Sequence, residues 1–373
     1  MKRSAMIVAF AVASGLGLLG RAEAKEPAVQ IALLLDTSNS MDGLINQAKS
    51  QLWSVVNQFI HAKRDGRPAS IEVALYEYGN DNLSPEEGFV RLVVPLTDDL
   101  DTVSERLFAL KTRGGSEFCG QVIRDATVQL TWSRSSRVYK AIFIAGNEPF
   151  SQGSVPYESA CRSAINKGII VNTIFCGTSS EGEQTGWSAG AALAEGRYLS
   201  IDHNQRVVAI PCPQDDEITQ LGLELNKTYI PYGKLGHAGQ ARQTAQDANA
   251  SSLSPSALAS RAVAKSSLNV YCNDTWDLID AIKTGKCKLD ELIDDDLPQE
   301  LRKLSKSERL ACIHEKTAQR DSVQKRILIL HREREAFLAA VRKQQAAANE
   351  ETLDTAILKA VREQANRANI QFD

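Results

Sequence analysis

The stretch VQIALLLDTSNSMDG, residues 29–43, decides the fold. It begins with a run of aliphatic residues and ends in a short polar segment that is rich in hydroxyls. Residues 44–62 follow, and their apolar positions recur at helical spacing. A buried strand that turns directly into an amphipathic helix is typical of proteins with a central parallel sheet. We therefore expect the first strand, turn and helix of an α/β domain here.

The same pattern continues to about residue 200. Five further apolar, β-branched runs follow the first strand, and amphipathic segments lie between most of them. The runs are Ile71–Tyr78, Phe89–Leu96, Val138–Ala145, Ile169–Phe175 and Arg197–Ile201. Strands that are hydrophobic without alternation, separated by helices, predict a doubly wound, mostly parallel sheet with helices on both faces. We assign residues 25–232 to this α/β domain.

The character of the chain changes after this domain. Residues 233–256 are rich in Ala, Gln, Ser and Gly and contain few large apolar side chains, which predicts a linker. Residues 257–373 are predicted to be all helical. One long helix there has a 4-3 spacing of apolar residues that is broken only by Arg334, which favours a coiled-coil-like seam. We expect an intramolecular hairpin with the Leu353–Ala368 helix, and a dimer is the alternative.

The N-terminus indicates the compartment. Lys2 and Arg3 precede the apolar run Ala5–Leu19, and Ala22-Glu23-Ala24 offers a signal-peptidase site, so residues 1–24 read as a signal peptide. The apolar run has about 15 residues, whereas a bilayer span needs about 20. An uncleaved anchor is the alternative. We expect a periplasmic or secreted protein with no membrane span in the mature chain.

Charge and cysteine content narrow the function classes. The formal net charge is −3, which argues against a nucleic-acid partner because such a partner needs a basic face. The seven cysteines are an odd number, so in an oxidising compartment some are expected to pair and at least one to stay free. A helix predicted between Cys272 and Cys287 argues against a bridge between those two, and Cys312 is the better partner for one of them.

Enzymatic chemistry is not indicated. The sequence has no nucleophile-elbow pattern around a Ser or Cys with a nearby His, and no glycine-rich phosphate loop follows a strand. Cys119 with His203 as base would be a nucleophile pair. A structural or disulfide-bonded cysteine is the favoured interpretation of Cys119 in an exported protein.

The polar turn after the first strand carries the candidate site. Asp36, Ser38 and Ser40 stand at alternate positions, at the carboxyl edge of the sheet where ligands bind in open α/β folds. One carboxylate and two hydroxyls are oxygen ligands that suit a hard cation such as Mg²⁺. Such a set leaves the cation with positive charge and an open position, which an acidic side chain of a partner can fill. Helix capping by Asp36 and Ser38 is the alternative.

The Asp-x-Ser-x-Ser pattern, placed between the first strand and a helix, resembles the metal-ion-dependent adhesion site of von Willebrand factor A (VWA) domains. The resemblance covers roughly residues 28–202, in a bacterial exported type with a helical C-terminal extension. It implies a non-enzymatic adhesion or assembly module with a protein partner. It also implies a divalent cation, with Mg²⁺ or Mn²⁺ favoured over Ca²⁺.

The family adds ligands from two further loops. It has a threonine in the second loop, where this chain has Ser116, and an aspartate in the third, where this chain has Gly146. Asn147 or Glu148 could supply the missing oxygen, and Glu148 is the candidate for the missing acid. The resemblance thus implies a metal site of Asp36, Ser38, Ser40, Ser116 and Glu148. The alternative is a metal-free periplasmic scaffold in which the helical tail makes the contacts and the site is vestigial.

Overall fold

The structure is a computed structural model that describes residues 27–201, 210–288, 292–345 and 353–372. A six-stranded sheet forms its centre, in the order β5-β4-β1-β6-β7-β8. The strands are β1 (Val29–Asp36), β4 (Ile71–Tyr78), β5 (Val90–Thr97), β6 (Tyr139–Gly146), β7 (Ile170–Cys176) and β8 (Tyr198–Ile201). All neighbours pair in parallel except β5, an antiparallel edge strand. The doubly wound, mostly parallel sheet is confirmed.

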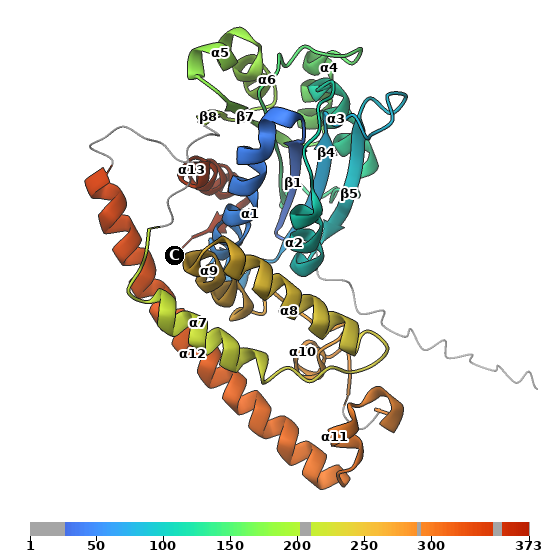
Figure 1. Cartoon of the computed structure of the whole chain (residues 1–373), viewed down its shortest axis with the longest axis vertical. Coiled ribbons are helices and arrows are strands. Elements are labelled where there is room, and N and C mark those ends of the chain that lie inside the picture. Colours follow the sequence, from blue (N-terminus) through green and yellow to red (C-terminus); the bar gives the residue numbers. More distant parts are fainter. Residues whose placement is uncertain (1–26, 202–209, 289–291, 346–352, 373) are drawn as a thin grey trace, which may run out of the picture.

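Helices cover both faces of this sheet (Figure 1). The bounds of those nearest the sheet are α1 (Asp42–Asn57), α2 (Leu100–Ala109), α3 (Cys119–Gln129), α4 (Tyr157–Asn166), α5 (Ser179–Gln184) and α6 (Trp187–Leu193). Ile31 and Leu35 of β1 pack on the side of α1 and α2, whereas Ala32 and Leu34 pack on the side of α3, α4 and α6. Because both faces are covered, β1 is apolar without alternation, as its sequence indicated.

A mainly helical region follows the sheet domain. It contains α7 (Asp215–Asn226), α8 (Gly236–Leu253), α9 (Pro255–Lys265), α10 (Leu278–Thr284), α11 (Gln299–Arg302), α12 (Lys306–Gln345) and α13 (Leu353–Ala365). The long helix α12 runs beside α7, and α8 and α9 lie between them and the sheet domain (Figure 1). Within the described residues, no helix is long and apolar enough to cross a bilayer.

The segment expected to be a linker, residues 233–256, instead contains α8. This helix has few large apolar residues, but its alanines favour helix formation and its small residues allow close packing. Gly239 lies so near Trp276 that an added Cβ would be 2.3 Å from the ring. The buried contacts are polar: Gln246 accepts a hydrogen bond from Ser104 of α2 at 2.9 Å, and Gln243 donates to Tyr271 at 3.3 Å. A composition count of large apolar residues does not register such an interface.

Buried arginines explain the irregular seam of α12. Arg334, which breaks the apolar spacing, is 5% exposed and pairs with Asp215 of α7 at 2.7 Å. Arg320, 1% exposed, pairs with Asp277 and Asp280 at the start of α10. The helix therefore packs against α7 and α9 with ion pairs set among its apolar contacts.

The C-terminal segment returns to the sheet domain. Helix α13 packs against α1, and in the described part of the chain it does not form the expected hairpin with α12. Gln364 exchanges hydrogen bonds with Asn172 of β7 and accepts one from Tyr139 of β6. Strand β9 (Ile370–Gln371) then pairs with β2 (Lys63–Arg64), which also pairs with β3 (Arg67–Pro68). The end of the chain thus completes the α1 face of the sheet.

The seven cysteines all lie within the described residues, and no disulfide bond forms among them there. The disulfide pairing expected from the sequence is therefore not formed in this structure. Cys119, Cys161, Cys176 and Cys212 are buried, so these thiols fill core positions as small apolar groups.

The pair His61 and His331 predicts acid sensitivity. The two rings stack 6.2 Å apart between the segment after α1 and helix α12. Burial, followed by the charge of Arg334, lowers the pKa of His331 to about 3. The folded pKa lies below the unfolded value of about 6.5, so neutral His331 contributes to the free energy of unfolding above pH 6.5. That contribution is lost as the pH falls toward 3. We expect His331→Phe to remove about 2 kcal/mol of the stability loss between about pH 7 and pH 5.

Urea unfolding followed by circular dichroism at the two pH values measures this. The matched control is His314→Phe on the exposed side of α12, which should retain the wild-type loss. Equal acid sensitivity of His331→Phe and wild type would contradict the assignment of the effect to His331.

Candidate functional site

Asp36 is the last residue of β1, at the centre of the sheet, and is fully buried. Its Oδ1 accepts a hydrogen bond from the Ser38 backbone N–H at 2.8 Å. Its Oδ2 is also buried and has no hydrogen-bond partner among the described residues. Burial, with added repulsion from Glu117 and Glu148, raises the pKa of this carboxyl to about 8. Asp36 is therefore a buried acid at the carboxyl edge of the sheet with one carboxylate oxygen left unsatisfied among the described residues.

The capping alternative for this turn does not hold. Ser38 precedes a short 3-10 turn (Asn39–Met41), and its side chain makes no capping hydrogen bond there. Helix α1 begins after Met41, again without a side-chain cap. Ser38 is 4% exposed and its hydroxyl lies within hydrogen-bonding reach of Asp36 and Glu117. The side chain of Ser40 lies outside what the structure describes.

The second loop brings Ser116 and Glu117 to the same edge. It is pressed against the end of β4, since a Cβ added to Gly115 would be 2.5 Å from the Gly79 carbonyl oxygen. Ser116 is half-buried, whereas Glu117 is 6% exposed. A Cβ added to Gly79 would meet Glu117 Cγ at 2.7 Å and Asp36 Oδ1 at 2.9 Å. The two acidic side chains are thus neighbours across Gly79.

Glu117 was not among the residues predicted from the sequence. Burial, and then the charge of Glu148, raises the pKa of its carboxyl to about 7. The available signal was an acidic residue directly after the loop hydroxyl and directly before α3. The sequence pattern of this loop contains only a hydroxyl residue, which matches Ser116, so the neighbouring Glu117 was not assigned to the site.

The third loop explains why residue 146 is glycine. A Cβ added to Gly146 would be 2.5 Å from the Tyr78 hydroxyl and 3.1 Å from Asp36 Oδ2. The Tyr78 hydroxyl donates to the Ala145 carbonyl at 2.9 Å, which fixes it in that position. An aspartate at position 146 therefore does not fit beside Tyr78.

Glu148 is half-buried and lies within electrostatic range of Asp36 and Glu117. Its Oε2 accepts a hydrogen bond from Gln152 Nε2 at 3.1 Å, and its carbonyl oxygen accepts from the Trp187 indole at 2.8 Å. Gln152 Oε1 in turn accepts from the Glu117 backbone N–H at 3.3 Å. Gln152 thus ties the second and third loops together.

The steric coupling of Tyr78 and Gly146 is testable. Gly146→Asp alone should destabilise the protein by about 1–3 kcal/mol, the usual cost of overpacking, with a further cost for a buried charge. Tyr78→Phe removes the hydroxyl and opens space for the new side chain. In a double-mutant cycle measured by urea unfolding, we expect a favourable coupling of about 1 kcal/mol or more. Additive effects of the two changes would show that Tyr78 does not exclude a side chain at position 146.

Cys119 is not placed as a nucleophile. The thiol is fully buried and hydrogen-bonds the Tyr78 hydroxyl at 3.8 Å. Burial raises the pKa of the thiol well above its ordinary value, which disfavours the reactive thiolate. His203, the base considered with it, lies outside the described residues.

The structure brings together Asp36, Ser38 and Glu117, with Glu148 and the loop of Ser116 beside them. Within the part of the chain that the structure describes, no group of three or more His, Cys, Asp or Glu side chains is arranged to hold a metal by itself. A cation here would need hydroxyl oxygens as well as carboxylates. The buried, unpartnered Asp36 Oδ2 and the hydroxyl of Ser38 fit that requirement.

Comparison with known proteins agrees with this architecture. The sequence model of the family described as "von Willebrand factor type A domain" matches residues 30–186. The chain thus contains a VWA domain, and a helical region follows it. No curated protein matches the chain.

The solved structures that match part of this chain share little sequence with it. A conserved hypothetical protein, BatB, from Bacteroides thetaiotaomicron is 17% identical, with 47% of this chain and 90% of that chain covered and a TM-score of 0.37. Proximal thread matrix protein 1 from the mussel byssus, with a zinc-occupied MIDAS motif, is 15% identical. The match covers 48% of this chain and 43% of that chain, with a TM-score of 0.37. The pilus adhesin SpaC from Lactobacillus rhamnosus GG is 12% identical. The match covers 48% of this chain and 28% of that chain, with a TM-score of 0.35.

Proposed function

We propose that this chain is a non-enzymatic binding protein, whose VWA domain holds a divalent cation at the carboxyl end of β1 and binds a protein partner there. One observation carries the proposal: Asp36 is fully buried, and its Oδ2 has no hydrogen-bond partner among the described residues. A buried carboxylate is costly unless a proton or a cation compensates it. A cation at Oδ2 would supply that compensation.

The charge around Asp36 supports a cation. Glu117 and Glu148 both add repulsion to the Asp36 carboxylate. Within the described residues, no ion pair neutralises any of these three acids. An incoming cation would therefore displace a proton from Asp36, whose pKa is about 8, and would not have to displace a basic side chain.

The proposed ligands are oxygen atoms from the first two loops. Asp36 contributes the carboxylate, and Ser38, Ser40 and Ser116 contribute hydroxyls. Glu148 supports the site from the third loop. When bound, the cation supplies a positive centre that accepts an oxygen of the partner. Oxygen ligands of this kind suit Mg²⁺ or Mn²⁺.

We also propose that the protein acts in the periplasm or is secreted. This proposal is supported by the sequence of residues 1–24, which lie outside the described residues. A partner would then be a protein of the cell envelope or its surroundings. The chemistry of the partner's contact depends on how much charge the protein's own acids leave on the cation.

A pull-down from native envelope extract tests the binding function. We expect a specific partner to be retained in the presence of Mg²⁺ or Mn²⁺, and to be released by a chelator or by Asp36→Ala. The control is Glu300→Gln, an exposed acid on α11 that changes the net charge equally. A partner that withstands both the chelator and Asp36→Ala would overturn cation-dependent binding and would support the scaffold role instead.

A further inference from the structure

Glu117 is a buried acid of the site that the sequence pattern does not use. It is 6% exposed. A Cβ added to Gly79 would lie 2.7 Å from Glu117 Cγ and 2.9 Å from Asp36 Oδ1, so both acidic side chains contact the same point of the backbone. The Ser38 hydroxyl lies within hydrogen-bonding reach of both carboxylates but has one proton to donate. Asp36 and Glu117 are thus two buried acids that share one hydroxyl donor, and Asp36 Oδ2 is left without a hydrogen-bond partner among the described residues.

We propose that Glu117 supplies the second carboxylate ligand of the cation, replacing the acid that Gly146 cannot provide. This inference rests on the proposed function, because it assigns a ligand to the cation site proposed above. An independent feature indicates a ligand at this point: Asp36 Oδ2, buried and without a hydrogen-bond partner among the described residues, belongs to the same cluster.

Glu148, the residue expected for this role from the sequence, is less suited to it. It is half-buried, and one of its carboxylate oxygens already accepts a hydrogen bond from Gln152. The same Gln152 amide accepts from the Glu117 backbone N–H. Gln152 therefore holds Glu148 beside the site and at the same time fixes the backbone of Glu117. We therefore assign a positioning role to Glu148, and the cation to the more deeply buried carboxylate of Glu117.

The assignment changes the expected chemistry of the partner. A divalent cation with two carboxylate ligands carries no net charge, and Glu148 adds a further negative charge nearby. Such a site attracts an acidic side chain of a partner weakly. The group that fits the open position is a neutral oxygen, such as a backbone carbonyl, an amide or a hydroxyl. The acidic contact expected from the sequence resemblance is thereby replaced by a neutral one.

Titration of the full chain with Mn²⁺ by calorimetry tests the ligand assignment. Glu117→Gln keeps the size of the side chain and removes its charge, and we expect it to weaken Mn²⁺ binding by about 100-fold or more. Glu148→Gln is the matched control, and we expect a loss of about 10-fold, the lower limit for groups that support metal ligands. Equal affinities of Glu117→Gln and wild type would overturn the inference.

Luminescence lifetimes of bound Tb³⁺ in H₂O and D₂O add a readout that a merely structural role would not change. Loss of a direct ligand opens a coordination position, so Glu117→Gln should gain about one bound water, whereas Glu148→Gln should gain none. A gain in Glu148→Gln instead of Glu117→Gln would reverse the two roles and refute the assignment. Glu117→Asp, which keeps the charge but is shorter, should lie between wild type and Glu117→Gln in Mn²⁺ affinity, and it tests the assignment if Glu117→Gln does not fold.

Failure of the inference can be told apart from failure of the proposed function. If the wild type binds no cation, the proposed function fails and so does the ligand assignment. If the wild type binds Mn²⁺ and Glu117→Gln binds it equally well, the cation site stands and the assignment of Glu117 is wrong. For the partner chemistry the probe is Mn²⁺, which keeps the divalent charge. Excess acetate should leave the water-proton relaxation of Mn²⁺ bound to the wild type unchanged, and displacement of bound water by acetate would contradict a neutral contact.

Discussion

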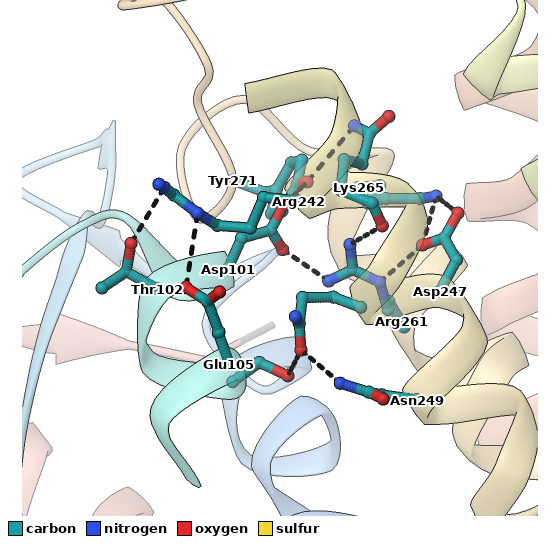
Figure 2. Close-up of polar contacts among 12 residues, drawn as sticks. Asp101, Thr102, Glu105, Arg242, Asp247, Asn249, Arg261, Lys265 and Tyr271 are labelled. Carbon is teal, nitrogen blue, oxygen red and sulfur yellow. Dashed lines mark hydrogen bonds and ion pairs between the residues drawn. The ribbon is translucent and has the colours of Figure 1, made fainter. Parts of the chain in front are cut away.

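Replacing Arg261 with methionine is expected to destabilise the folded protein by about 3–5 kcal/mol, the usual cost of removing one partner from a buried ion pair. Arg261 lies on α9 and is fully buried. It bonds Asp101 of α2 at 2.6 Å and Asp247 of α8 at 2.5 Å (Figure 2). Methionine preserves much of the length of the side chain but leaves two buried acids with less compensation.

The surroundings of Arg261 show why the loss is large. Its guanidinium lies over the rings of Trp53 and Tyr271, 4.7 and 5.7 Å from their centroids. Burial alone would raise the pKa of Asp247, but the charges of Lys265 and Arg261 hold it at about 2. The cluster joins the sheet domain, through α2, to α8 and α9. Loss of Arg261 should therefore weaken the contact between the two parts of the chain.

Equilibrium unfolding in urea measures this effect. The matched control is Arg242→Met in the same region, because Arg242 is about one-third exposed and pairs with half-exposed Asp99 and Glu105. We expect a loss of less than about 1 kcal/mol for the control, as for surface ion pairs. Adding Asp101→Asn to Arg261→Met should recover part of the stability. A loss below 1 kcal/mol for Arg261→Met would contradict the role of this cluster in joining the two parts.

Asp36→Asn is expected to have two opposite effects. It should abolish cation binding, because it removes the carboxylate at the centre of the site. It should also stabilise the cation-free protein at pH 8, because an ionised Asp36 is buried without compensation. The folded pKa of about 8 lies above the ordinary value of 3.8, so the stability of the wild type is full below pH 3.8 and declines as the pH rises toward 8.

The magnitude follows from this difference in pKa. The new amide gains no hydrogen-bond partner, which offsets part of this gain. We expect the free energy of unfolding of Asp36→Asn to exceed that of the cation-free wild type by on the order of 3 kcal/mol at pH 8. The free energy of unfolding in the presence of a chelator measures the gain, and Glu300→Gln is the control. Equal stabilities of wild type and Asp36→Asn at pH 8 would show that Asp36 is compensated within the fold.

The sheet domain was predictable because each of its strands can be recognised from its own local sequence. Each apolar run is long enough to cross the sheet and is bounded by polar turns, so all six strands follow from the sequence. The packing of the helices that follow the sheet domain was not predictable in this way. Helix α8 buries glutamines, and α13 returns to α1 from a distant point in the sequence. Neither feature leaves a local pattern, since both depend on which surface the segment meets.

The site was predictable in part for the same reason. Asp36 and Ser38 follow a strand whose end must lie at the carboxyl edge, so their neighbourhood was fixed by local sequence. Glu117 and Tyr78 act through contacts across strands. Whether Gly146 leaves a gap or makes room for the Tyr78 hydroxyl depends on packing that the sequence does not record.

The most direct test of the central claim is a calorimetric titration of the full chain with Mg²⁺, Mn²⁺ and Ca²⁺ near pH 8. We expect saturable binding of one cation per chain, tighter for Mg²⁺ or Mn²⁺ than for Ca²⁺, and no binding to Asp36→Asn. Because the cation competes with the proton on Asp36, its affinity should also fall as the pH is lowered below about 8. No binding of any of the three cations to the folded wild type at millimolar concentration would contradict the proposed cation site.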